Sequence, residues 1–246
     1  MRVGDYDIHP GANLSNAQLC GVDFYELLGL KQLNGGPGAN LRRCNFMRAN
    51  LKASRHYHSD FLGADLTNAD MRDTYCYEVR FGSGVKLEEE ASALLVNTDF
   101  RGAYLGGSVF YGVNARGALF ASANLEYCVA FGATFDGADF TGANLKNFNS
   151  FYWIDHRFGP TSFSSANFEN ANLSDARLRN CILTGANLRF ANLKGADLSG
   201  ANLYKADLTD ANLTDANLTD ANLTDANLTD ANLTDANLTG VIGYKP

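Results

Sequence analysis

The chain has 246 residues, of which 46% are apolar and only four are prolines, and its net charge is −7. This length suits one solenoid domain or two short ones, and no apolar stretch reaches the roughly 18 residues of a membrane span. The first residues lack the apolar core of a signal peptide, so we expect a cytoplasmic protein without a membrane span.

A five-residue repeat runs through the chain and is most regular from Thr161 to Gly240, where it becomes a run of Ala-Asn-Leu-Thr-Asp units. One position of each unit, named i here, holds a large apolar residue such as Phe163 or Leu188, and position i−2 is usually Ala. A helix repeats its apolar face every 3.6 residues and a strand every 2, so neither explains a period of five. The backbone itself must repeat, which predicts a solenoid with i and i−2 inside and a corner after i.

The repeat divides the chain into a cover, a solenoid and a tail. We expect residues 1–11 to cover the first coil, because Val3, Tyr6 and Ile8 are apolar and an uncovered coil would expose backbone groups. The solenoid is predicted over residues 12–240, followed by a tail at 241–246. The register breaks at three predicted insertions, near 26–38, 83–96 and 151–160.

The second insertion carries a helical pattern. Leu87, Ala91, Leu94 and Leu95 have the spacing of one apolar helix face, and three glutamates lie between the first two. We therefore expect a short amphipathic helix laid against the solenoid.

The A(N/D)LxG and A(N/D)LxD units resemble those of the pentapeptide repeat family. The resemblance implies an all-β fold, a right-handed quadrilateral (four-sided) β-helix solenoid with twenty residues in each coil. The chain would then form about ten coils. A coil of twenty residues also places Phe100, Phe120 and Phe140 in one interior column.

The sequence offers little chemistry for catalysis or metal binding. Four cysteines occupy interior positions and only Cys20 points outward, which favours structural thiols in a reducing compartment; the four are Cys44, Cys76, Cys128 and Cys181. His56 falls at an interior position and His58 outside, so the two histidines cannot hold one metal from a regular unit. Asp155 and His156 lie in an insertion with no activated nucleophile nearby. We expect no enzyme activity, no cofactor and no metal.

The negative charge is concentrated near the C-terminus. Residues 206–240 contain seven aspartates and no lysine or arginine. We name six of them, which occupy one position of successive units, the acidic collar: Asp210, Asp215, Asp220, Asp225, Asp230 and Asp235. Phosphate binding needs clustered cations, so direct nucleic-acid binding is not expected.

The third insertion is the predicted binding site for a protein partner. It places aromatic and basic side chains outside the repeat, and such residues dominate interface energetics; they are Phe151, Tyr152, Trp153, Ile154, His156, Arg157 and Phe158. The favoured function is a scaffold that binds a protein of unknown identity, as a monomer or an end-to-end homodimer. Alternatively, these side chains fold back and patch the seam where the register shifts.

A second hypothesis comes from the family resemblance. The quinolone-resistance branch of the family is an acidic rod that resembles B-DNA and occupies the DNA site of a type II topoisomerase. The rod shape and the acidity of this chain fit that function, but its acidic collar covers only the last coils, whereas duplex DNA is charged along its whole length.

Overall fold

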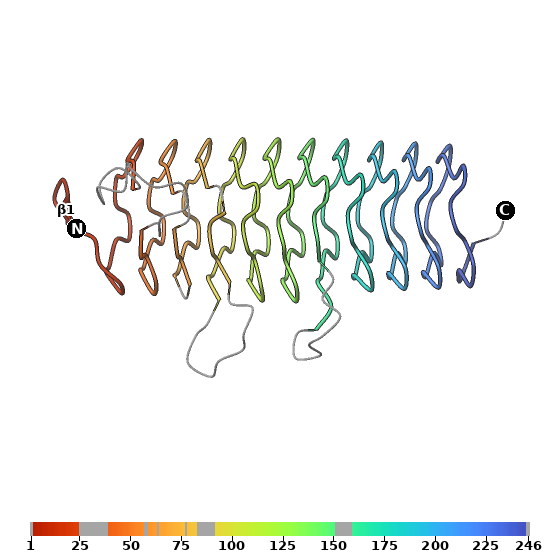
Figure 1. Ribbon diagram of the computed structural model, residues 1–246, viewed down its shortest axis with the longest axis horizontal. Coiled ribbons are helices and arrows are strands. Elements are labelled where there is room, and N and C mark those ends of the chain that lie inside the picture. Colours follow the sequence, from red (N-terminus) through yellow and green to blue (C-terminus); the bar gives the residue numbers. More distant parts are fainter. Residues whose placement is uncertain are drawn as a thin grey trace.

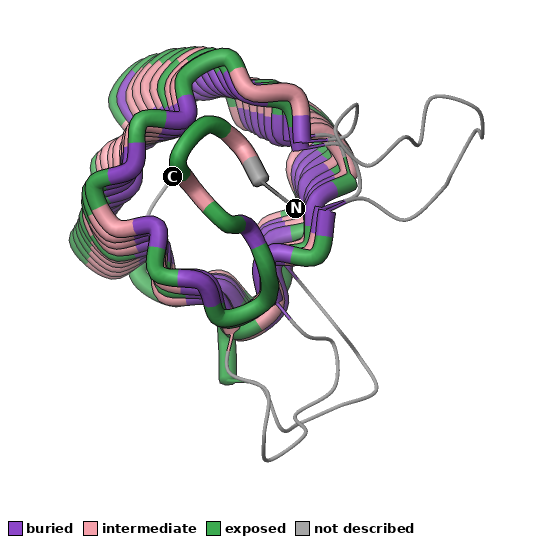
Figure 2. The backbone as a smooth tube through the Cα atoms, turned by 90° about the vertical axis from the view of Figure 1, so that its left-hand side faces the viewer, coloured by how far each residue is buried: buried purple, intermediate pink, exposed green. Residues whose placement is uncertain are grey.

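The computed structural model describes residues 2–24, 39–56, 59–62, 64–76, 78–82, 92–150 and 159–244. The chain winds into a rod of stacked coils, with the N-terminal residues at one end and the C-terminal residues at the other (Figure 1). Viewed along the rod, the coils superimpose in a four-sided outline, with buried and exposed residues alternating along each side (Figure 2).

Parallel bridges between successive coils hold the rod together. The named strands are β1 (Arg2–Val3) and β2 (Tyr6–Asp7), which pair antiparallel. The other pairings among the described residues are isolated parallel bridges between residues at i−1, arranged in four ladders. We name the four faces after these ladders: face A runs from Asn13 to Ile242, face B from Gln18 to Asn227, face C from Asp23 to Asn232 and face D from Asn40 to Asn237.

A tight turn follows each i residue and forms a corner between two faces. In the unit of Phe100, for example, the backbone N–H of Ala103 donates to the carbonyl of Phe100 at 2.9 Å. The third residue of the turn, Gly102, has a φ of 69°, the left-handed value that a type II turn requires there. This requirement explains why position i+2 is rich in Gly, Asn and Asp, which adopt that conformation at the lowest cost.

Asparagine at position i−1 satisfies backbone and side-chain groups together. The Oδ1 atom of Asn192 accepts a hydrogen bond from the backbone N–H of Lys194 at 3.2 Å, and its Nδ2 atom donates to Oδ1 of Asn172 at 3.1 Å. The first bond stabilises the corner within a coil, and the second joins two coils. The preference for Asn at this position is therefore structural.

The interior is filled by the residues at i and i−2. Phe120 is fully buried and stacks between Phe100 and Phe140, with ring centroids 5.0 and 4.8 Å apart. This confirms the predicted interior column. All four cysteines predicted to be interior are buried, and Cys20 is exposed. Burial raises the pKa of the Cys76 and Cys181 thiols to about 12, so both stay protonated at neutral pH.

The prediction of a helix in the second insertion is wrong for its C-terminal residues, Leu94 and Leu95. Leu94 is 43% exposed and bridges Asp65 and Asn114 on face A, while Leu95 is fully buried beside Ala93. These residues form a regular unit, in which i−1 points outward and i inward. Two adjacent leucines pointing in opposite directions produced the apparent helical spacing. Leu87 and Ala91 lie outside the described residues.

The two ends of the rod differ. At the N-terminal end, the hairpin of β1 and β2 lies across the opening of the first coil (Figure 2); Ile8 is buried, and Val3 and Tyr6 pack against the core. At the C-terminal end, the i residues of the last coil, including Leu228 and Leu238, are only partly buried because no described residue lies beyond them. Residue Ile242 still bridges Asn222 on face A. No helix among the described residues could span a membrane.

Candidate functional site

All three insertions interrupt the chain at an edge of face D. Bridged residues are normally 20 positions apart, but the separation rises to 32, 29 and 28 across the three breaks. The first insertion starts after Phe24, between a unit of face C and a unit of face D. The second starts after Gly82 and the third after Ser150, and both lie between a unit of face D and a unit of face A. Face D is therefore the side of the rod that the insertions flank.

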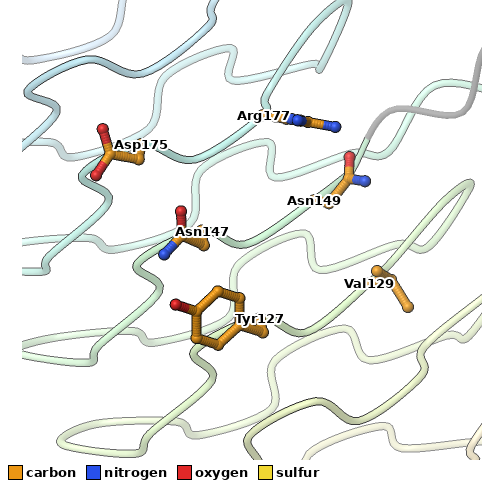
Figure 3. Close-up of a pocket in the computed structure, with 6 residues that line it drawn as sticks. All are labelled: Tyr127, Val129, Asn147, Asn149, Asp175 and Arg177. Carbon is orange, nitrogen blue, oxygen red and sulfur yellow. The ribbon is translucent and has the colours of Figure 1, made fainter.

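Face D contains a hollow of about 310 Å³ next to the start of the third insertion. Its lining comes from three successive coils in two parallel columns, as Figure 3 shows. The corner between faces C and D supplies Tyr127, Asn147 and Asp175, and the ladder of face D supplies Val129, Asn149 and Arg177. We name these six residues the face D hollow.

Tyr127 occupies a backbone position that suits other residues better. It lies at i+2 of its corner with a φ of 59°, where the column otherwise contains residues such as Gly107 and Asn147. Its ring is 63% exposed, the largest value among the exposed large apolar residues of the described chain. A bulky side chain in the left-handed region costs roughly 1 to 2 kcal/mol, and its exposure returns little packing energy. Such a residue is a candidate for function.

Arg177 is the cationic group of the face D hollow. It is exposed and makes no ion pair with another described residue. The nearby carboxylate of Asp175 lies against the next coil instead, because its Oδ1 atom is 2.7 Å from where a Cβ on Gly195 would be. The guanidinium is therefore available to a ligand.

Aromatic side chains also lie at the corner between faces D and A. Tyr111 and Phe131 occupy equivalent positions of successive coils and stack with centroids 4.8 Å apart. Gly82 has the equivalent position in the preceding coil, and a Cβ there would be 2.0 Å from the backbone oxygen of Tyr111. Only glycine allows the chain to leave the solenoid at this point without displacing the next coil.

The predicted partner-binding residues cannot be placed on face D directly. Phe151 to Phe158 lie outside the described residues, although the flanking Ser150 and Gly159 fix where this segment leaves and rejoins the solenoid. The acidic collar is described: all six aspartates are exposed and have positive φ values at the corners of the last coils. Their side chains ring the rod and do not gather on one face.

The buried histidine does not form a metal site. His56 is fully buried, and its Nε2 atom is 2.7 Å from Oγ of Ser54. That hydroxyl donates to the carbonyl of Leu51 at 2.5 Å, so Nε2 of His56 is the donor and Nδ1 is left unprotonated. Among the residues described, no group of three or more His, Cys, Asp or Glu side chains could hold a metal ion. His58 is outside them.

The residues of the face D hollow were not predicted as a site. One signal was present in the sequence: Tyr127 and Phe190 are aromatic residues at i+2, where glycine, asparagine and aspartate dominate. The proximity of Tyr127, Val129 and Arg177 was not visible. This proximity depends on how many residues of the third insertion lie outside the regular coils. The five-residue repeat does not determine that number, so the sequence does not show which residues before and after the insertion align in successive coils.

Comparison with known families agrees with this geometry. The family model for pentapeptide repeats matches eight copies, at residues 44–81, 93–128, 108–147, 161–200 and 201–240, which together cover more than half of the chain. The chain belongs to the pentapeptide repeat family, whose members fold into right-handed quadrilateral β-helices. A search of curated proteins found no match.

Solved structures of pentapeptide repeat proteins are similar to this chain. HetL, a protein involved in heterocyst differentiation regulation from the cyanobacterium Nostoc sp. strain PCC 7120, is 27% identical, with a TM-score of 0.75 over 96% of this chain and 92% of HetL. A thylakoid-lumen protein from Arabidopsis thaliana is 32% identical over 45% of this chain and 64% of its own, with a TM-score of 0.30. The plasmid-mediated fluoroquinolone resistance protein QnrB1 is 22% identical over 96% of this chain and 92% of its own, with a TM-score of 0.37. Of these three, the similarity to HetL supports the fold.

Proposed function

We propose that this chain is a non-enzymatic scaffold that binds a protein partner through face D and its flanking insertions. The observation that supports this most strongly is the position of the three breaks, all at an edge of one face out of four. The bridge ladders continue across each break, so the inserted residues add nothing to the pairing that holds the coils together. Loops held by rigid coils on both sides present side chains to a partner at a small entropic cost.

The third insertion and the face D hollow form one continuous surface in this proposal. One lining residue of the hollow, Asn149, directly precedes Ser150, the last described residue before the insertion. Tyr127 and Arg177 are residue types that are enriched at binding hot spots. Trp153 and its aromatic neighbours in the insertion would extend the same contact. The free state of all five cysteines supports a reducing compartment such as the cytoplasm.

The alternative function is an acidic DNA-mimicking rod that inhibits or protects a type II topoisomerase. The exposed acidic collar supports it. Along the rest of the rod, however, arginines neutralise the aspartates of the outer faces, as Arg72 does for Asp70 at 2.7 Å and Arg101 does for Asp99 at 2.7 Å. Continuous negative charge is what a duplex mimic needs. Inhibition of DNA supercoiling by the intact protein would favour this alternative.

Site-specific photo-cross-linking tests the scaffold proposal. We expect a photoreactive amino acid at Val129, on face D, to trap a discrete protein partner in cells. The matched control is Leu119, also a half-buried aliphatic residue at i−1 but on face B. The same partner trapped equally from both positions, or trapped only from Leu119, would contradict the assignment to face D.

A further inference from the structure

We propose that the face D hollow recognises a carboxylate side chain of the partner protein. In this inference Arg177 binds the carboxylate, and an apolar side chain of the same partner segment packs on Tyr127 and Val129. The inference rests on the proposed function, because it specifies the chemistry of the partner that face D binds.

The lining of the hollow changes in character along the rod axis. Tyr127 and Val129 form the first rung, Asn147 and Asn149 the second, and Asp175 and Arg177 the third (Figure 3). The rungs follow the coil spacing of about 4.8 Å, so about 10 Å separates the apolar end from the charged end. A peptide in the polyproline II conformation rises about 3.1 Å per residue with three residues per turn, so two side chains three residues apart lie on the same side and span roughly the same distance.

Arg177 differs from most arginines of the rod. Seven others pair with aspartates of their own or a neighbouring coil: Arg42, Arg55, Arg72, Arg80, Arg101, Arg116 and Arg189. Arg48 also shows no ion pair, but it lies at a corner between faces A and B, away from any insertion. Arg177 thus combines a guanidinium that makes no ion pair with another described residue and a position inside a hollow.

The charge balance of the hollow favours a carboxylate over a phosphate. The planar guanidinium of Arg177 can hold a carboxylate with two parallel hydrogen bonds. Asp175 lies two residues away and would repel a dianion more strongly than a monoanion. The Asn147 amide beside them can donate to either an acidic side chain or a peptide carbonyl.

Two peptides that differ in one group test this inference on the intact protein. The probes are acetyl-Phe-Gly-Gly-Glu-amide and acetyl-Phe-Gly-Gly-Gln-amide. Each peptide is titrated to millimolar concentration into isotope-labelled protein, and NMR follows the Nε–H signal of Arg177 and the backbone amide signal of Tyr127. We expect saturable shifts of both signals with the Glu peptide and an affinity about tenfold lower for the Gln peptide.

Two arginine substitutions test whether the charge of Arg177 is responsible for binding the Glu peptide. Arg177→Gln should bind the Glu peptide about tenfold more weakly and remove the preference for Glu, whereas Arg48→Gln should behave as the unchanged protein. Equal affinity for the two peptides, or no shift at Arg177 with either, would overturn the carboxylate inference. In that case a partner trapped at Val129 would still support face D as the binding surface, so the two proposals can fail separately.

Discussion

Replacing Phe120 with Ala is expected to lower the free energy of unfolding by about 3 to 5 kcal/mol, through the cavity it leaves. The ring is fully buried, stacked between two others and in edge contact with Phe135 at a centroid distance of 6.0 Å. Each coil contacts only its neighbours, so a gap in the middle of the column cannot be closed by distant parts of the rod. Chemical unfolding followed by circular dichroism measures the effect.

Phe190 provides the matched control for this substitution. It is 47% exposed at a corner and contacts the guanidinium of Arg189 at 5.4 Å from its ring centroid. Phe190→Ala should change the free energy of unfolding by less than about 1 kcal/mol, because surface substitutions remove little packing. Equal losses for the two variants would show that the interior column does not carry the stability of the rod.

Acidification between about pH 6.5 and pH 4.5 is expected to cost about 2 to 3 kcal/mol of stability through His56 alone. Burial lowers the pKa of this imidazole from 6.5 to about 3, and the nearby charge of Asp23 opposes part of that shift. In this pH window the unfolded chain binds a proton that the folded chain does not. Stability from this group is therefore complete above pH 6.5 and is lost as the pH falls toward 3.

The pKa of His56 is low because a charged imidazolium would have no partner in the interior of the rod. Nδ1 of His56 lacks a hydrogen-bond partner, and the ring stacks on Phe24 at 4.5 Å and meets the edge of Phe61 at 5.1 Å. A His56→Leu variant should lose the pH dependence in this window, because leucine fills position i without a titratable group. Parallel stability curves for the two proteins between pH 6.5 and 4.5 would contradict this account.

The sequence alone predicts the interior of the rod well. Position i points inward in every coil regardless of which residue occupies it, so even His56 and Ser150, polar residues in an apolar column, are placed correctly by counting in fives. The same argument places the buried cysteines. A strict local period determines the direction of each side chain without any knowledge of tertiary contacts.

Prediction was poorer where side chains from different coils meet. Leu94 and Leu95 fit both a helix and a solenoid unit, and the contacts of Leu94 with other coils distinguish the two, because it bridges Asp65 and Asn114. The face D hollow joins Tyr127 to Arg177 across the third insertion, whose effect on coil alignment the repeat does not determine. A solenoid sequence thus specifies inside and outside more clearly than it specifies neighbours on the surface.

The most direct test of the account measures the affinity of two tyrosine variants for the partner trapped at position 129. Tyr127 lies in the face D hollow, and Tyr104 is an exposed tyrosine on face C, 52% accessible. Asn is compatible with the left-handed backbone at position 127, so Tyr127→Asn should keep or slightly raise the free energy of unfolding. We expect Tyr127→Asn to weaken partner binding by about tenfold or more and Tyr104→Asn to change it by less than about twofold. Unchanged binding by Tyr127→Asn, or an equal loss in both variants, would contradict the assignment of face D as the binding surface.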